Sequence, residues 1–190
     1  MARPRSDDKR KAILAAATQV VAEQGIGAPT AKIAKLAGVA EGSLFTYFSN
    51  KDELINQLYV ELKSELGELM MVGYPKRAAT KAKVKHAWQR YVDWGVAHPA
   101  KRKAMAQLAV SDRISEQTRA VMMRSFAEMN ELLGDTLAHG PLRGCPDNFV
   151  GALMGAMAET TMEFMSREPK SAERYADAGF EAFWNAVAKA

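Results

Sequence analysis

The side chains that most often carry out catalysis are few and scattered in this sequence. Its 190 residues include 3 histidines, His86, His98 and His139, and 1 cysteine, Cys145. None of them stands at a spacing typical of a catalytic nucleophile, a zinc site or a phosphate-binding loop. Gly25-Ile26-Gly27 lacks the third glycine and the preceding strand of a dinucleotide-binding loop. We therefore predict that the chain is not an enzyme and needs no metal ion and no cofactor.

Residues 33–48, which are rich in small and hydroxyl side chains, indicate a binding surface rather than a catalytic site. This stretch predicts two short helices joined by a turn at Gly38, which is a helix-turn-helix pattern. Leu44 and Phe48 stand four residues apart and are expected to hold the second helix from the inside. The other side chains of that helix then face outward, where they would meet the base edges and phosphates of DNA: Glu41, Gly42, Ser43, Phe45, Thr46 and Tyr47.

Basic residues on either side of this motif suit the same partner. Lys51 stands at the start of the next expected helix, where its ammonium and the free backbone N–H groups could hold one phosphate together. Arg3 and Arg5 lie in a proline-containing arm ahead of the first expected helix. Such arms follow the DNA backbone or enter the minor groove in other helix-turn-helix proteins. A solvated tail without a partner is the alternative for these two arginines.

One pattern of residues runs through this part of the chain: Ile33-Ala34, Ala37-Gly38-Val39, Gly42-Ser43-Leu44-Phe45, Tyr47-Phe48, Lys51 and Leu54. This pattern resembles the TetR family of bacterial transcriptional regulators, strongly over about residues 7 to 54 and only in architecture beyond them. The resemblance implies DNA-facing positions for Thr30, Ala40, Glu41, Ser43, Phe45, Thr46, Tyr47 and Lys51. Among these, it implies that Tyr47 and Lys51 bind phosphates and that Glu41 and Thr46 lie near bases.

The sequence also departs from the family pattern. Ala40 stands where the family often has a serine, and Phe45 where it often has a tyrosine, so two hydroxyl groups that could bind phosphate are missing. Pro29-Thr30 stands closer to Ile33 than in many members. Residues 1–54 hold eight Lys or Arg and six Asp or Glu, a net charge of only +2. Affinity for DNA must therefore depend on where the charges lie, and a dimer would double the phosphate contacts.

The elements that must position these residues are expected to be helices throughout. Ala, Leu, Met, Glu and Lys are abundant, Pro is sparse, and the apolar residues recur at spacings of three and four, so the fold class is predicted to be all-α. The expected helices are 7–24, 30–37, 41–48, 51–72, 79–97, 100–111, 113–138, 147–167 and 171–189. We expect a helix-turn-helix DNA-binding domain over 7–53 and a helical effector-binding and dimerisation domain over 54–190.

The composition excludes several classes of protein. With 48% hydrophobic and 25% charged residues, the chain can bury a core and is not expected to be disordered. A single cysteine cannot form an internal disulfide, which argues against a small secreted scaffold. The longest apolar tract, 149–158, is too short to span a bilayer, so we expect no membrane segment and a cytoplasmic location.

Two helices near the C-terminus are expected to form a homodimer interface, as the resemblance also implies. Helix 147–167 carries Gly151, Gly155 and Ala158 on a smooth face, and helix 171–189 carries apolar and small residues at compatible spacings: Tyr175, Gly179, Ala182, Phe183 and Ala186. Two such helices from each subunit could make a four-helix contact. Ordinary packing within one chain is the alternative.

The resemblance implies an effector pocket in the larger domain, and methionine and aromatic residues could line it. The candidates are Trp88, Tyr91, Trp94, Met105, Met122, Phe126, Met129, Glu159 and Met162. Plain core packing is the alternative for the apolar members. Glu159 and Glu163 would favour a cationic ligand if they face the pocket, and would carry no such meaning if they face solvent or pair with Arg167.

These expectations combine into one function. We expect a homodimeric DNA-binding transcriptional regulator, a repressor that binds a palindromic double-stranded operator and is released by a small-molecule effector. The alternative is a helical protein that binds a small molecule or another protein and has no specific DNA binding.

Overall fold

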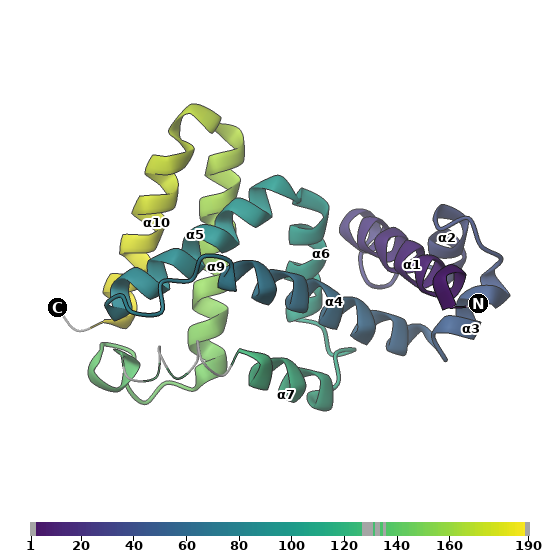
Figure 1. Cartoon of the computed structure of the whole chain (residues 1–190), viewed down its shortest axis with the longest axis horizontal. Coiled ribbons are helices and arrows are strands. Elements are labelled where there is room, and N and C mark those ends of the chain that lie inside the picture. Colours follow the sequence, from purple (N-terminus) through teal and green to yellow (C-terminus); the bar gives the residue numbers. More distant parts are fainter. Residues whose placement is uncertain (1–2, 127–130, 132–133, 135, 189–190) are drawn as a thin grey trace. The chain divides into compact units, whose positions relative to one another are not determined.

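The protein is built from helices, as expected. The structure, a computed structural model, describes residues 3–126, 131, 134 and 136–188. No strand occurs among these residues, which confirms the all-α fold class. The helices in Figure 1 are α1 (Arg3–Gln24), α2 (Thr30–Leu36), α3 (Glu41–Tyr47), α4 (Lys51–Met71), α5 (Thr80–Ala97), α6 (Pro99–Ala109), α7 (Glu116–Ser125), α9 (Asp147–Arg167) and α10 (Ala172–Val187), with the 3-10 turn η1 (Pro169–Ser171) before α10.

The chain forms two compact units, each made of two separate stretches of sequence. Unit 1 comprises Met1–Ser64 and His98–Met122, and unit 2 comprises Glu65–Ala97 and Met123–Ala190. Unit 1 therefore combines α1, α2, α3 and α6 with most of α4 and of α7. The division of the sequence at residue 53 stays a prediction, because the unit that holds the helix-turn-helix motif reaches further along the chain.

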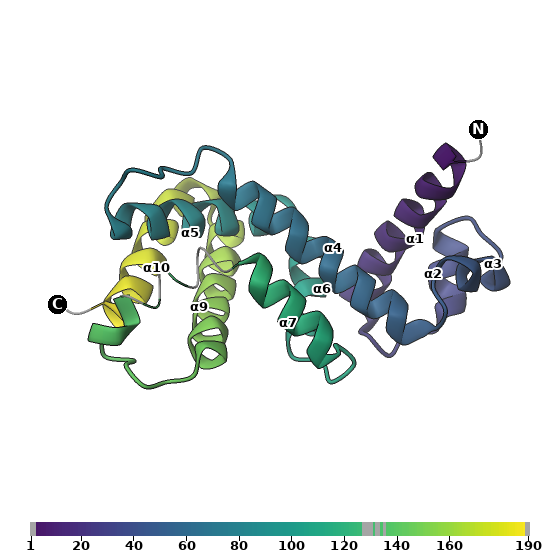
Figure 2. The same cartoon turned by 60° about the horizontal axis from the view of Figure 1, so that its bottom comes forward.

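Helix α1 is the element against which much of unit 1 packs. Four apolar residues of α1 at spacings typical of one helix face are buried: Ile13, Ala17, Val20 and Val21. Helices α2 and α6 both lie against α1, and Figure 2 shows α2 and α3 together beside it. Because apolar residues recur at helical spacing, one face of α1 can be removed from water along most of its length.

The turn between α2 and α3 has the geometry that the sequence predicts. Gly38 has a φ of +68°, a conformation that glycine adopts without the cost that a Cβ would bring. The Val39 N–H donates to the Ala34 carbonyl at 3.0 Å, which closes α2 across the turn. Each of the two helices ends one residue earlier than predicted, α3 because Phe48 is already extended, with a φ of −136°.

Unit 2 has its core between α5, α9 and α10. Figure 1 and Figure 2 show α9 and α10 side by side, and both contact α5. Trp88 is fully buried there; its ring stacks on Phe183 at 5.7 Å and its Nε1 donates to the Ala176 carbonyl at 3.0 Å. A Cβ at Gly179 would come within 2.9 Å of the Trp88 ring and collide with Thr161, so only glycine permits this approach of the helices.

The start of α1 and the extent of α7 differ most from the prediction. Helix α1 begins at Arg3 rather than Asp7, because a proline in the first turn of a helix is tolerated. The expected helix 113–138 is not continuous: α7 begins only at Glu116 and ends at Ser125. Its start is set by Ser115, whose Oγ accepts a hydrogen bond from the Thr118 N–H at 3.1 Å and so caps the helix.

Two further features concern only the part of the chain that the structure describes. No helix there is both long and apolar enough to cross a membrane. No three or more side chains of His, Cys, Asp and Glu gather there as they would around a metal ion.

Candidate DNA-binding surface

The outer face of α3 stands on a rigid, buried base. Leu44 is fully buried and Phe48 is 1% exposed, so the inner side of α3 is fixed as predicted. Arg10 of α1 covers the Phe48 ring, with its guanidinium carbon 5.6 Å from the ring centroid. The same guanidinium donates to the Gln57 Oε1 at 2.9 Å, which joins α1, α3 and α4 at one point.

The residues expected to face DNA lie on the surface of unit 1. Phe45 is 42% exposed, a large exposed fraction for an aromatic side chain. The exposed members are Ala40, Glu41, Gly42, Ser43, Phe45 and Thr46, and the half-buried members are Thr30, Tyr47 and Lys51. A Cβ added to Gly42 would meet nothing within 4 Å among the described atoms. The side chains on this face are therefore mostly short and exposed, which allows a helix to approach the bases of the major groove closely.

Thr30 and Glu41 are joined across the front of the motif. The Thr30 hydroxyl donates to the Glu41 Oε1 at 2.7 Å, so the first residue of α2 holds the first residue of α3. Both side chains remain at the surface. The sequence placed both on the DNA-facing side but held no indication that they contact each other.

Lys51 has a role in the fold that its sequence position did not indicate. Its Nζ donates to the Ala28 carbonyl at 2.7 Å, which fixes the loop ahead of α2. Partial burial lowers the pKa of Lys51 and the nearby charge of Arg113 lowers it further, while Asp52 acts in the opposite direction. The binding of a phosphate by Lys51 stays a prediction, to be weighed against this anchoring contact.

The first turn of α4 is capped by its own side chains. The Glu53 carboxylate accepts hydrogen bonds from the Ser49 hydroxyl and from the Ser49 N–H, the latter at 2.6 Å, and the Asn50 Oδ1 accepts one from the Glu53 N–H at 2.8 Å. The hydrogen bond from the Ser49 hydroxyl, followed by that from its N–H, lowers the pKa of the Glu53 carboxyl. This reciprocal capping fixes where α4 starts relative to α3.

The two N-terminal arginines lie in the first turn of α1, not in an extended arm. The expectation of an arm ahead of the first helix is therefore wrong, for the reason given for Pro4 above. The side chains of Arg3 and Arg5 are outside the described part of the structure, so their contact with DNA stays a prediction.

A polar clamp, formed by Asp52, Asn56, Arg113 and Ser115, joins the loop between α6 and α7 to the start of α4. The Asn56 Nδ2 donates to the Arg113 carbonyl at 2.8 Å, and the Asn56 Oδ1 accepts from the Ser115 N–H at 3.0 Å. Arg113 also forms an ion pair with Asp52 at 2.6 Å. Sequence reasoning missed this clamp because its partners are far apart along the chain and neither stretch carries a recognisable motif.

The candidate ligand-binding residues are distributed over both units. In unit 2, Trp88 and Met162 are fully buried in the core that α5, α9 and α10 share, and Tyr91 packs against it. In unit 1, Met105 and Met122 are 5% exposed. Met129 lies outside the described residues. For Trp88 and Met162 the structure therefore provides a packing role, and ligand binding by the whole set stays a prediction.

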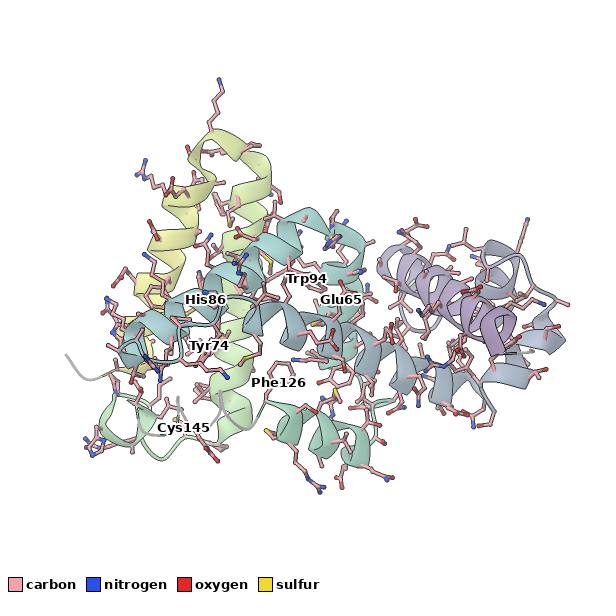
Figure 3. The ribbon with its side chains drawn as sticks, viewed as in Figure 1. Glu65, Tyr74, His86, Trp94, Phe126 and Cys145 are labelled. Atoms are coloured by element: carbon pink, nitrogen blue, oxygen red, sulfur yellow. The ribbon has the colours of Figure 1, made fainter. Side chains whose placement is uncertain are left out.

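Trp94 and Phe126, both labelled in Figure 3, and Glu159 have specific surroundings in unit 2. The Trp94 Nε1 donates to the Glu65 Oε1 at 2.9 Å, which gives a partly buried carboxylate that sequence reasoning did not single out. The Phe126 ring lies over Gly67, 3.2 Å from where a Cβ would stand. Glu159 is half-buried, while its neighbour Glu163 pairs with Arg167 one turn away.

The face expected to mediate dimerisation is only partly free. Ala158 and Phe183 are fully buried in the core of their own unit, and Gly179 is covered by Trp88 and Thr161. These three residues were wrongly placed on an external face, because small and aromatic residues at helical spacing suit an internal helix pair equally well. Gly151 and Gly155 do remain open, with no described atom within 4 Å of an added Cβ.

Comparison with known proteins gives one consistent result. Residues 13–58 match the family described as "Bacterial regulatory proteins, tetR family". A "Fatty acid metabolism regulator protein" of Bacillus subtilis (strain 168) is 37% identical over 73 residues, which cover 38% of this chain and 38% of that protein. The chain thus matches well under half the length of that relative.

Solved structures extend the likeness over the whole chain. A putative tetR family transcription regulator from Shewanella sp. PV-4 has a TM-score of 0.83 at 27% identity, covering 96% of this chain and 99% of that one. The transcriptional regulator FadR from Bacillus subtilis, in complex with stearoyl-CoA, has a TM-score of 0.68 at 18% identity, covering 93% and 98%. With the helix-turn-helix geometry described above, these matches show that residues 13–58 form the helix-turn-helix region of the TetR family of bacterial regulators and that the whole chain has the fold of a TetR-family regulator.

Proposed function

We propose that this regulator is a repressor that binds a palindromic operator as a homodimer and is released from it by a small-molecule effector. The observation that carries the DNA-binding part is the outer face of α3: small, hydroxyl and aromatic side chains are exposed on a helix whose inner side is fully buried. Because its side chains are small or polar apart from Phe45, this face can approach the base edges of the major groove closely.

The hydroxyl groups on this face would supply most of its DNA contacts. Ser43 and Thr46 are exposed and Tyr47 is half-buried, so each can reach a phosphate or a base edge at the protein surface. We assign a phosphate contact to Tyr47 and to Lys51. Lys51 can serve both roles, because an ammonium has three donors and the Ala28 carbonyl takes only one of them.

The dimer would place two copies of α3 in successive major grooves, about 34–36 Å apart. We propose that the open faces of α9 and α10 form the contact between subunits. Phe149 is 50% and Phe164 39% exposed on α9, and Ala152 and Ala156 lie exposed between them. This apolar surface would be removed from water by a second copy.

The effector in this proposal is a molecule with an apolar body. Trp94 and Phe126 supply aromatic surface within unit 2, and the bound molecule of the FadR structure, stearoyl-CoA, has a long apolar chain. A fatty acyl thioester is therefore the first compound to test. A cationic effector has less support, because the Glu163 carboxylate already pairs with Arg167.

The decisive experiment is binding to the DNA that flanks the gene itself, with non-specific competitor DNA and at two salt concentrations. We expect a footprint over an inverted repeat whose affinity falls steeply with salt. The variant Gly42→Glu should lose at least about 100-fold in affinity, because it places a charge and bulk against the groove. It should still fold, since the added side chain meets only open space.

The matched control is Ala106→Glu, which adds the same charge at an exposed position of α6 in the same unit. It should bind like the unchanged protein. If a folded, dimeric protein shows no selectivity for this or any other DNA, the protein is better described as a helical ligand-binding protein. Release from the footprint by an acyl thioester would support the effector class, and unchanged affinity in its presence would argue against it.

A further inference from the structure

The recognition face contains one acidic side chain that calls for a physical explanation. Glu41 is the only Asp or Glu between residues 29 and 48, and it is exposed at the first position of α3. A carboxylate that approaches DNA is repelled by the phosphates, so its presence on this face is unfavourable unless it meets a hydrogen-bond donor. The donors that DNA offers to an acceptor in the major groove are amino groups on bases.

The structure holds this carboxylate in one orientation. The Thr30 hydroxyl donates to the Glu41 Oε1 at 2.7 Å, and no other described side chain donates to the Glu41 carboxylate. The second oxygen, Oε2, therefore keeps its capacity to accept a hydrogen bond. Because Thr30 begins α2 and Glu41 begins α3, the contact fixes the carboxylate relative to both helices of the motif.

The four bases differ in the hydrogen-bond donors and acceptors that they present to a carboxylate in the major groove. Guanine presents N7 and O6 and thymine presents O4, all of them acceptors that repel a carboxylate. Adenine presents an N6 amino group next to the N7 acceptor, and only cytosine presents an N4 amino group without an acceptor beside it. An ionised carboxylate, which can only accept, is thus best matched by cytosine.

We propose that Glu41 recognises the N4 amino group of a cytosine in each operator half-site and that Thr30 is its positioning residue. This inference rests on the proposed function, in which α3 enters the major groove. Cytosine at that position should be preferred over each other base by roughly 5- to 150-fold in affinity, the range that one mismatched pair produces.

The test is a selection from a pool of randomised DNA duplexes with the full-length protein, followed by affinities for each single-base change in the selected site. The unchanged protein should select an inverted repeat that contains a cytosine at one defined position of each half-site. In the Glu41→Gln variant, the base preference at that position should change. Because a glutamine side chain pairs with the N6 and N7 of adenine, the preference at that one position should change from cytosine to adenine. All other positions should keep their preferences.

Two more variants separate recognition from a structural role. Glu41→Ala should lose the preference for cytosine without gaining another, and Thr30→Val should weaken that preference because the carboxylate is no longer oriented. Glu61→Gln, which neutralises an exposed carboxylate of α4 in the same unit, should select the same site as the unchanged protein. Circular dichroism and the midpoint of thermal unfolding check that each variant is folded.

Several outcomes would overturn the inference. If Glu41→Gln and Glu41→Ala select the same site as the unchanged protein with uniformly lower affinity, the Thr30–Glu41 contact only supports the fold. A selected site without a cytosine that responds to these variants would equally refute it, while leaving the proposed function intact. A folded protein that selects no sequence at all would overturn the proposed function and this inference together.

Discussion

At the scale of single residues, Lys51 shows how one side chain can serve both the fold and the partner. Its ammonium anchors the loop ahead of α2 through the Ala28 carbonyl, and its half-buried position still leaves part of it at the surface. The lowered pKa of Lys51 follows first from burial and then from Arg113. Both effects disfavour the charged form, whereas a phosphate that approached Lys51 would favour it.

Substitution of this lysine should therefore have two separate effects. In Lys51→Met we expect a lower midpoint of thermal unfolding, because the Ala28 carbonyl no longer has its donor. We also expect DNA affinity about 10-fold lower and a salt dependence whose slope is smaller by about two for the bound dimer, since each of its two subunits then neutralises one phosphate fewer. Isothermal binding over a series of salt concentrations measures the second effect separately from the first.

The matched control for this change is Lys103→Met, which removes an exposed charge from α6 in the same unit. It should leave both the unfolding midpoint and the salt slope nearly unchanged. If Lys51→Met lowers stability but leaves the slope and affinity of the folded protein unaltered, Lys51 belongs to the fold alone and the phosphate contact is wrong.

At the scale of elements, Asn56 is the central residue of the clamp that ties the α6–α7 loop to α4. Its side chain makes two contacts with that loop, at 2.8 and 3.0 Å, and a third with the Asp52 carbonyl of its own helix at 2.8 Å. We expect Asn56→Ala to lower the free energy of unfolding by about 1–2 kcal/mol, since it removes a few partly exposed hydrogen bonds. The backbone amide of Ser115 should exchange its hydrogen faster.

Gln117→Ala is the suitable comparison, because Gln117 is exposed on α7 and no hydrogen bond of its side chain occurs among the described contacts. Chemical denaturation gives the free energies and hydrogen exchange gives the local effect. Equal stability of the two variants, with unchanged exchange at Ser115, would mean that the loop is held by other contacts, such as the Arg113–Asp52 ion pair.

The sequence predicts the existence of elements better than their ends. Helix 147–167 was predicted with its observed bounds, since Pro146 and the residues after Arg167 interrupt the helical pattern. The start of α7 was missed by three residues, because the capping role of Ser115 depends on its backbone geometry rather than on residue type alone. Helical spacing alone likewise could not place Gly179 and Phe183, which pack inside their own unit.

For the candidate DNA-binding surface, the sequence predicted which side chains face inward and outward but not the contacts between them. The inward residues Leu44 and Phe48 and the outward set around Ser43 follow from the period of a helix, and the structure places them accordingly. The contacts that hold the site do not follow from any local pattern. Thr30 with Glu41, and Lys51 with Ala28, join residues 11 and 23 positions apart, which only the folded chain brings together.

At the scale of the whole molecule, the arrangement of each unit from two separate stretches could not be read from the sequence. Residues 98–122 belong to the unit that contains the helix-turn-helix motif, although they follow a stretch that belongs to unit 2. A division at residue 53 assumes that a domain is continuous in sequence. That division stays a prediction, but the packing of α6 on α1 could not have been foreseen, because neither helix carries a sequence pattern that identifies the other as its partner.

Dimerisation is the property of the whole molecule on which the proposed operator binding depends most. We expect Ala156→Glu to convert the dimer to a monomer in sedimentation experiments, because it places a charge between Phe149 and Phe164 on the open apolar face of α9. Operator affinity should fall with it, since a monomer binds one half-site and makes only half of the phosphate contacts. The circular dichroism spectrum should not change.

The comparison that decides the case is Ala82→Glu, which adds the same charge at an exposed position of α5 in the same unit. This variant should remain dimeric and bind the operator normally. A dimeric Ala156→Glu would show that the subunits meet through another surface and that Phe149 and Phe164 are exposed for a different reason. A further outcome is a monomeric Ala156→Glu that binds the inverted repeat with the same affinity as the unchanged protein. The DNA contacts of one subunit would then be sufficient to fill a half-site without the partner subunit, and operator binding would not depend on dimerisation.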